Sequence, residues 1–218
     1  MKSFYEFVLM PVSLLRRIVA KLDRASLAVR FKKVGKNLML VPFGSVFSAE
    51  TIELGHNVFI GQQAYFGGII TIGNNVMFGP RVTIVGADHL FAVEGESVRF
   101  LKPHSLENAR PVSIEDEAWI GANAILIGEI TVGMGAVVGA GSVVTSDVPP
   151  FTIVGGNPAR TLRRIFNDGV LLRHLRSLGY SEEFAKNVIA RRRSLLGGVK
   201  LHIVDRTHRR QDRKRVTE

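Results

Sequence analysis

His89 has the sequence setting best suited to proton transfer among the six histidines of this chain. A neutral imidazole has an unperturbed pKa of about 6.5, so it can accept a proton from an alcohol near neutral pH. The preceding Asp88 could orient that imidazole or bind a hydroxylated substrate. Two alternatives stay open. His89 could be a surface residue at the base of a loop, or His104, further along the loop, could be the base. We expect His104 instead to contact a substrate or a neighbouring subunit.

Other kinds of catalysis are excluded by residue type. The chain contains no cysteine, which rules out disulfides, a thiolate nucleophile and Cys-ligated zinc or iron–sulfur centres. No serine stands beside a base, so we expect no covalent intermediate on the protein. His56, His89 and His104 lack the spacing that would bring them together as metal ligands, and we predict no metal site.

A six-residue repeat determines which elements must position these side chains. Large apolar residues recur at every sixth position in two runs, and a smaller or β-branched residue follows four positions after most of them. The two runs are Leu54, Ile60, Phe66, Ile72, Phe78 and Ile84, then Ile114, Ile120, Leu126, Val132, Val138 and Val144. Six matches neither the helical period of 3.6 nor simple strand alternation. It fits a chain that turns a corner every six residues, so that three hexads form one coil of a triangular β-helix.

Residues 90–113 interrupt this repeat with a polar, proline-bearing segment that cannot fill the interior of the coils. Asp88 also breaks the rule, because it occupies an inward position otherwise held by apolar or small residues. Long loops that leave a rigid scaffold commonly carry binding residues. We therefore predict an extruded loop at 90–113, with His89 at its base.

The sequence resembles the hexapeptide-repeat acyltransferases, and among them the maltose, galactoside and polysaccharide O-acetyltransferases. Three stretches over residues 118–160 carry this resemblance: Ala118-Trp119-Ile120-Gly121-Ala122-Asn123, Val138-Gly139-Ala140-Gly141-Ser142, and Val154-Gly155-Gly156-Asn157-Pro158-Ala159-Arg160. The resemblance implies a left-handed parallel β-helix, a homotrimer, and transfer of an acetyl group from acetyl-CoA to a sugar or glycan hydroxyl. It also implies that His89 is the general base, since it follows the Val82-Thr83-Ile84 hexad.

The same resemblance implies a coenzyme A track. The small residues Gly121, Ala122 and Ala140 would let the pantetheine arm approach the backbone, although corner packing alone also explains them. Trp119 occupies an outward position, where it would lie beside that arm or form a subunit contact. The nucleotide end would meet three further residues, namely Thr145, Arg160 and Arg163. Guanidinium groups suit phosphate, but a solvated helix start would also explain these arginines.

The acceptor side departs from the family pattern. Maltose and galactoside acetyltransferases carry a sugar-binding Asn early in the prism, whereas this chain has Gln62 and Gln63 there. The two glutamines could bind the sugar, or the acceptor could differ. We assign the substrate side to Asp88, Gln62, Gln63 and His104.

Both ends of the chain are basic, with net charges of +7 over residues 1–36 and +10 over 160–218, around a middle of −7. We predict an amphipathic helical cap at 1–40, a β-helix domain at 41–159 and a basic helical extension at 160–218. Anionic membrane contact through these flanks is the alternative to packing and solvation. No groove-reading motif accompanies the basic tail, so we predict no nucleic-acid partner. We expect a cytoplasmic protein, with peripheral attachment to the inner membrane face left open.

Two other functions remain open at this point. The first is N-acetylation of an amino sugar or a xenobiotic, which would use the same base and the same acyl donor. The second is a β-helix scaffold without catalysis, whose basic arms bind a membrane or a partner. The scaffold hypothesis predicts no affinity for coenzyme A, so that binding distinguishes it from both enzymes.

Overall fold

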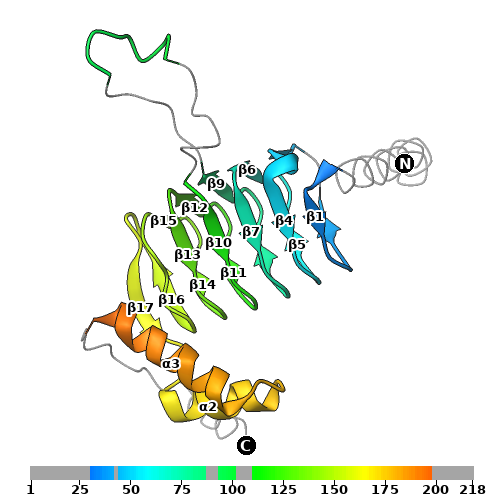
Figure 1. The fold of residues 1–218 in the computed structure, drawn as a ribbon, viewed down its shortest axis with the longest axis vertical. Coiled ribbons are helices and arrows are strands. Elements are labelled where there is room, and N and C mark those ends of the chain that lie inside the picture. The colour runs from blue at the N-terminus through cyan, green and yellow to red at the C-terminus, as the bar shows by residue number, and fades with distance from the viewer. Residues whose placement is uncertain (1–29, 42–43, 87–92, 102–109, 198–218) are drawn as a thin grey trace, which may run out of the picture.

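The computed structural model describes residues 30–41, 44–86, 93–101 and 110–197. Three sheets of short strands form the sides of a prism, and within them every pairing except β16 with β17 is parallel (Figure 1). Sheet A contains β1 Lys33–Val34, β4 Ile52–Leu54, β7 Ile70–Ile72, β10 Val112–Ile114 and β13 Ile130–Val132. Sheet B contains β2 Met39–Leu40, β5 Phe59–Ile60, β8 Met77–Phe78, β11 Trp119–Ile120, β14 Val137–Val138, β16 Thr152–Gly155 and β17 Arg160–Arg164. Sheet C contains β3 Val46–Phe47, β6 Tyr65–Gly68, β9 Thr83–Gly86, β12 Ile125–Ile127 and β15 Val143–Val144.

Each coil runs through sheets A, B and C in turn, and successive coils stack in register. Ile72 pairs with Ile114, for example, although 42 positions separate them in the sequence. All twelve apolar residues of the two predicted runs are buried, and their side chains form the prism core. The hexad pattern therefore correctly predicted a parallel β-helix. The driving force is the burial of one continuous apolar column between three narrow sheets.

We call the three edges of the prism corner 1, from sheet A to B, corner 2, from B to C, and corner 3, from C to A. At corner 1, Asn57 and Asn75 adopt φ angles of 57°, a left-handed conformation that asparagine tolerates better than most residues. Their side chains form a ladder, in which Asn57 donates to Asn75 at 2.8 Å and Asn75 donates to Glu117 at 2.7 Å. The turn residues of successive coils are thus joined by side-chain hydrogen bonds.

The prism begins earlier than the predicted boundary at residue 41. Strand β1 pairs with β4, so that Val34 lies opposite Leu54, and β2 pairs with β5. The predicted helical cap at 1–40 is therefore wrong for residues 33–40; residues 1–29 lie outside the described ones. The repeat was missed because Val34 and Leu54 are twenty positions apart, two more than in a regular coil. A short 3₁₀ helix, Ala49–Thr51, lies within this longer coil.

The C-terminal extension also departs from its prediction at its start. Residues 160–164 form β17, which pairs antiparallel with β16, and are not helical. Two helices follow, in agreement with the helical extension predicted for this region, α2 Asp168–Ser177 and α3 Glu182–Leu196. Ser181 caps α3 by accepting a hydrogen bond from the Phe184 amide at 3.1 Å. The two helices enclose a second core at the end of the prism, made by Met134, Phe151, Leu171, Leu175, Ala185 and Ile189.

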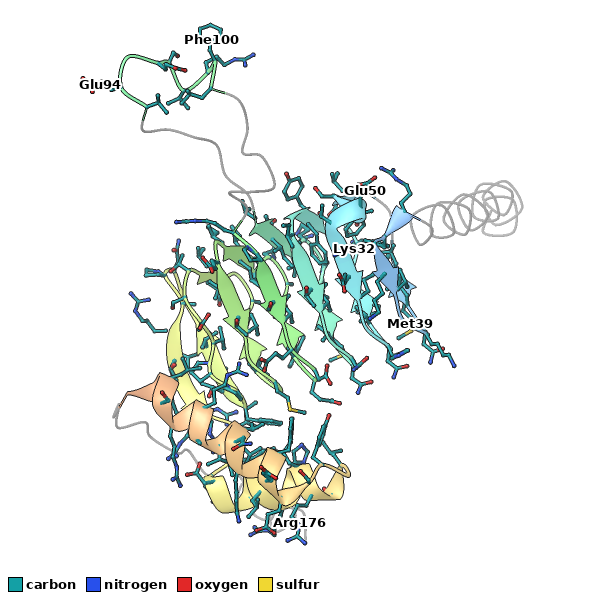
Figure 2. The ribbon with its side chains drawn as sticks, viewed as in Figure 1. Lys32, Met39, Glu50, Glu94, Phe100 and Arg176 are labelled. Carbon is teal, nitrogen blue, oxygen red and sulfur yellow. The ribbon has the colours of Figure 1, made fainter. Side chains whose placement is uncertain are left out.

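The inserted loop leaves the prism at corner 3. The chain departs after Gly86 and returns at Arg110, whose amide donates to the Gly86 carbonyl at 2.9 Å. The predicted end at residue 113 is too late, because Val112 and Ser113 already belong to β10 beside β7. Phe100, on the described part of the loop, is 83% exposed (Figure 2). Within the described ranges, no helix has the length and hydropathy needed to span a bilayer.

Candidate active site

Trp119 lies on the outer face of sheet B, as predicted, and its side chain is 50% exposed. The strand register places it beside Met77 on one side and Val137 on the other. Beyond Val137 the same row continues through Ile153 to Arg163. Strands in a sheet are about 4.8 Å apart, so Trp119 and Arg163 stand roughly 14 Å apart along one face of the prism.

Corner 2 carries several of the other predicted residues. Gln62 and Gln63 are exposed at this corner, and Ala122 and Ala140 occupy it in later coils. The Gly141 amide donates to the Ala122 carbonyl at 2.8 Å, which stacks these turns directly. The fold therefore aligns these four residues, which the sequence predicted separately, along one edge of the prism next to Trp119.

Gly121 has a structural reason to be glycine. It is buried, and a Cβ there would lie 2.6 Å from the Ala140 nitrogen and 2.8 Å from the Val138 carbonyl oxygen of the next coil. Such distances are too short for a side chain. The residue thus permits close stacking of two coils, whereas Ala122 and Ala140 retain partial or full exposure.

Arg160 begins β17 at the C-terminal end of the prism, and Thr145 directly follows β15. Arg160 lines a pocket of about 170 Å³ together with Val144 and Ser146, the two neighbours of Thr145 in the chain. The Arg160 guanidinium donates a hydrogen bond to the backbone carbonyl of the preceding residue, Ala159, at 2.9 Å. In the described part of the chain, neither Arg160 nor Arg163 forms an ion pair with a carboxylate, so their charges are available to an anion.

Asp88, His89 and His104 lie outside the described residues. The nearest described position to His89 is Gly86, three residues earlier, on β9 at corner 3. Among the described residues, no three histidine, aspartate or glutamate side chains lie close enough to hold a metal ion.

Sequence reasoning missed a cluster that holds the two C-terminal helices together. Asp168 accepts hydrogen bonds from Arg192, which is fully buried, and from Arg193 at 2.7 Å. Burial raises the pKa of Asp168, but the hydrogen bonds from Arg193 and Arg192 outweigh that effect and leave the pKa below its ordinary value. Desolvation in turn lowers the pKa of Arg192. In the sequence, the only indication of this cluster is the abundance of arginine in the C-terminal extension.

Comparison with known proteins places this architecture in a family. Residues 111–146 match the model of the "Hexapeptide repeat of succinyl-transferase". A hexapeptide-repeat acetyltransferase of Vibrio cholerae, solved with acetyl-coenzyme A, is 32% identical with a TM-score of 0.59; the match covers 66% of this chain and 76% of that one. A maltose O-acetyltransferase of Clostridium difficile is 34% identical with a TM-score of 0.58, over 65% of this chain and 73% of that one.

The chain belongs to the hexapeptide-repeat acetyltransferase family. A galactoside O-acetyltransferase of Lactococcus lactis is also similar, at 30% identity over 138 residues, which are 62% of this chain and 64% of that protein. The chain spans between 57% and 64% of the length of the curated relatives that it matches first. Family membership confirms the resemblance seen in the sequence, while the role of each individual residue stays a prediction.

Proposed function

We propose that this family member transfers an acetyl group from acetyl-coenzyme A to a sugar hydroxyl, as part of surface glycan synthesis. The observation that carries the proposal is the alignment of Trp119, the corner 2 alanines and Arg163 along one side of the prism. That arrangement supports an extended donor carrying phosphates at one end. The Vibrio cholerae relative is complexed with acetyl-coenzyme A, and the other two relatives are named as sugar O-acetyltransferases.

The described residues fit such a donor. Arg160 and Arg163 offer guanidinium groups without carboxylate partners in the described part of the chain, at the end of the prism where phosphates would lie. Trp119 and Met77 offer an apolar surface on sheet B, and Ala122 and Ala140 leave the backbone of corner 2 accessible. Bound there, the donor supplies an activated acetyl group as a thioester.

The residues proposed for the site would come from two different edges of one chain. Trp119 and the glutamines are near corner 2, whereas the loop that follows His89 leaves from corner 3. About five residues of sheet C separate these corners, roughly 16 Å at about 3.3 Å per residue. We therefore propose that corner 2 of one copy meets corner 3 of the next, in a homotrimer. Exposed apolar residues on sheets B and C, such as Met77 at 48% and Tyr65 at 48%, support this assembly.

In the proposed reaction, His89 accepts the proton of the acceptor hydroxyl as its oxygen attacks the thioester carbonyl. A carbon–oxygen bond forms, the carbon–sulfur bond breaks, and the proton passes from His89 to the departing thiolate. The acceptor leaves as an acetyl ester and the donor as a free thiol. Gln62 and Gln63, exposed at corner 2, would hydrogen-bond the acceptor.

Calorimetric titration with coenzyme A at physiological salt tests the donor site. We expect saturable binding, weakened about tenfold or more by Arg160→Ala because one charge-assisted phosphate contact is lost. Arg176→Ala is the matched control, since Arg176 lies on α2 and pairs with Glu182. Its affinity should equal that of the wild type. Absence of binding at millimolar coenzyme A would contradict the proposal.

Acetyl transfer then tests the base. With acetyl-coenzyme A and a panel of sugar acceptors, His89→Ala should lower kcat by about a hundredfold or more while coenzyme A affinity is retained. Unchanged turnover in His89→Ala would assign the base to another residue, and His104→Ala tests the alternative within the same loop.

A further inference from the structure

Sheet A differs from the other two sheets in what it presents outward. In sheets B and C the outward positions carry exposed apolar side chains, among them Met77, Trp119 and Tyr65. In sheet A the corresponding positions of three successive coils carry Thr71, Ser113 and Thr131, which the strand register places side by side. We call these three residues the hydroxyl row. A row of hydroxyl groups makes a polar surface that can both donate and accept hydrogen bonds.

Two hollows border the hydroxyl row and share Ser113. The larger, of about 550 Å³, lies between sheet A, corner 1 and α3, and its lining includes Thr71, Asp116 and Phe184. The smaller, of about 370 Å³, lies toward corner 3 and is lined by residues that include Pro111 and Glu129. Because Ser113 lines both, the two hollows adjoin each other across sheet A, and together we call them the groove. From residue 111 to residue 116 it extends roughly 16 Å, at about 3.3 Å per residue.

The groove contains the groups that recognise a hydroxylated ring. Phe184 is 40% exposed at one end and stacks on Tyr180, with ring centroids 4.8 Å apart, so the pair offers a fixed aromatic face. Asn187 on α3 adds an amide to the same hollow. Polar groups placed around an aromatic or apolar wall are what a binding site for a small polar molecule needs.

The charge of the groove restricts what can bind. Four carboxylates line it, and the one arginine among its lining residues, Arg191, is paired with Glu115 at 2.6 Å. The other three carboxylates are Asp116, Glu129 and Asp147. Asp116 accepts a hydrogen bond from the backbone amide of Asn74, and Asp147 accepts one from the backbone amide of Thr131. A groove of this sign repels acidic ligands and accepts hydrogen bonds from neutral or cationic ones.

We propose that this groove binds an oligosaccharide acceptor that carries no acidic group, several sugar units long. The inference rests on the proposed function and gives its acceptor class: the substrate is an oligomer or polymer rather than a free monosaccharide. One end of the groove reaches Pro111, next to Arg110, where the inserted loop returns to corner 3. A glycan lying along sheet A would therefore lead toward the loop that begins near His89.

Calorimetric titration with three oligosaccharide series tests this groove without requiring catalysis. The series are malto-oligosaccharides, which are neutral, chitosan oligosaccharides, which are cationic, and oligogalacturonates, which are acidic, each from two to six units. We expect the affinity for the neutral or the cationic series to rise with length by tenfold or more. Oligogalacturonates should bind at least tenfold more weakly. Equal affinity at all lengths, no binding of either non-acidic series, or preference for galacturonates would overturn the proposal.

Three variants locate the site. Ser113→Trp should fill the point shared by the two hollows and abolish the gain in affinity with length. Lys33→Trp is the matched control, because Lys33 is an outward residue of sheet A outside both hollows and should change nothing. Glu129→Lys should raise oligogalacturonate affinity threefold or more. Coenzyme A affinity, measured on the same samples, should be unchanged, so failure of the groove and failure of the donor site give different results.

Discussion

A single carboxylate, Asp168, holds the C-terminal helices in place. It lies at the start of α2 and accepts hydrogen bonds from Arg192 and Arg193 on α3, while the Arg164 guanidinium of β17 lies 3.9 Å away. The Arg192 side chain is fully buried, and its NH1 group also donates to the Phe166 carbonyl at 2.9 Å. Removing the carboxylate would leave a buried guanidinium without its counter-charge, which is more costly than losing an exposed ion pair.

We therefore predict that Asp168→Asn destabilises the protein by about 3 kcal/mol, at the low end for a broken buried pair because Asp168 keeps 24% exposure. Urea unfolding followed by far-UV circular dichroism measures this. Because the folded pKa lies below the ordinary 3.8, the stabilisation is present above that value and is lost as the pH falls through the folded pKa. The wild-type stability should thus fall below about pH 4, and the variant should show a smaller fall. An equal fall in both would contradict this role.

At the scale of the element, the turns of corner 1 matter as much as the strands they connect. Each strand of the prism contributes only two to five residues to its ladder. The ladder through Asn57, Asn75 and Glu117 adds hydrogen bonds between coils at positions where the backbone turns. Asparagine suits these turns because its side chain is short and polar and it tolerates positive φ.

Substitution at Asn75 separates the conformational contribution of asparagine from its hydrogen bonds. Asn75→Gly should lose the side-chain ladder but keep the φ of 57° without strain. Asn75→Ala should lose the ladder and also place a Cβ in the left-handed region, which costs about 1 kcal/mol more. Thermal unfolding of the two variants measures the difference. If Asn75→Ala were as stable as Asn75→Gly, backbone conformation would not explain the choice of asparagine.

For the whole molecule, the exposed apolar rows on sheets B and C call for a partner surface. Met39 is 57% exposed and Val46 is 58% exposed on the first coil, and the rows continue through Met77 and Trp119. Sheet A carries hydroxyl and charged side chains in its outward row instead. This contrast supports self-association through sheets B and C and leaves sheet A free for the proposed glycan groove.

Met77→Glu should shift the proposed trimer toward monomers, because a carboxylate would be buried against an apolar surface. Sedimentation velocity at micromolar concentration measures the species present. The same variant should lose acetyl transfer, since the proposed active site needs residues from two copies. Thr71→Glu, at the equivalent position on sheet A, is the control and should sediment like the wild type. A wild-type monomer that is fully active would overturn the proposed assembly.

The sequence by itself predicted the β-helix, because one inward apolar residue every six positions has no other regular explanation. It also predicted the outward position of Trp119 and a helical C-terminal extension, because helical periodicity is a local feature of the sequence. It misplaced the two ends of the prism. The first coil is two residues longer than the repeat, and β17 reaches the sheet by antiparallel pairing, for which hexad spacing carries no signal.

Only the tertiary structure decided which outward residues share a side. Neighbours along one face of the prism are eighteen positions apart in regular coils and 42 apart across the insertion, as for Thr71 and Ser113. When outward residues are grouped by this spacing of eighteen or 42 positions, those on sheet A are hydroxylic or charged. Those on sheets B and C are largely apolar. The hollow that Phe184 and Arg191 line together with sheet A depends on how α3 folds back on the prism. Such contacts arise from packing between distant segments, so no local pattern could predict the groove.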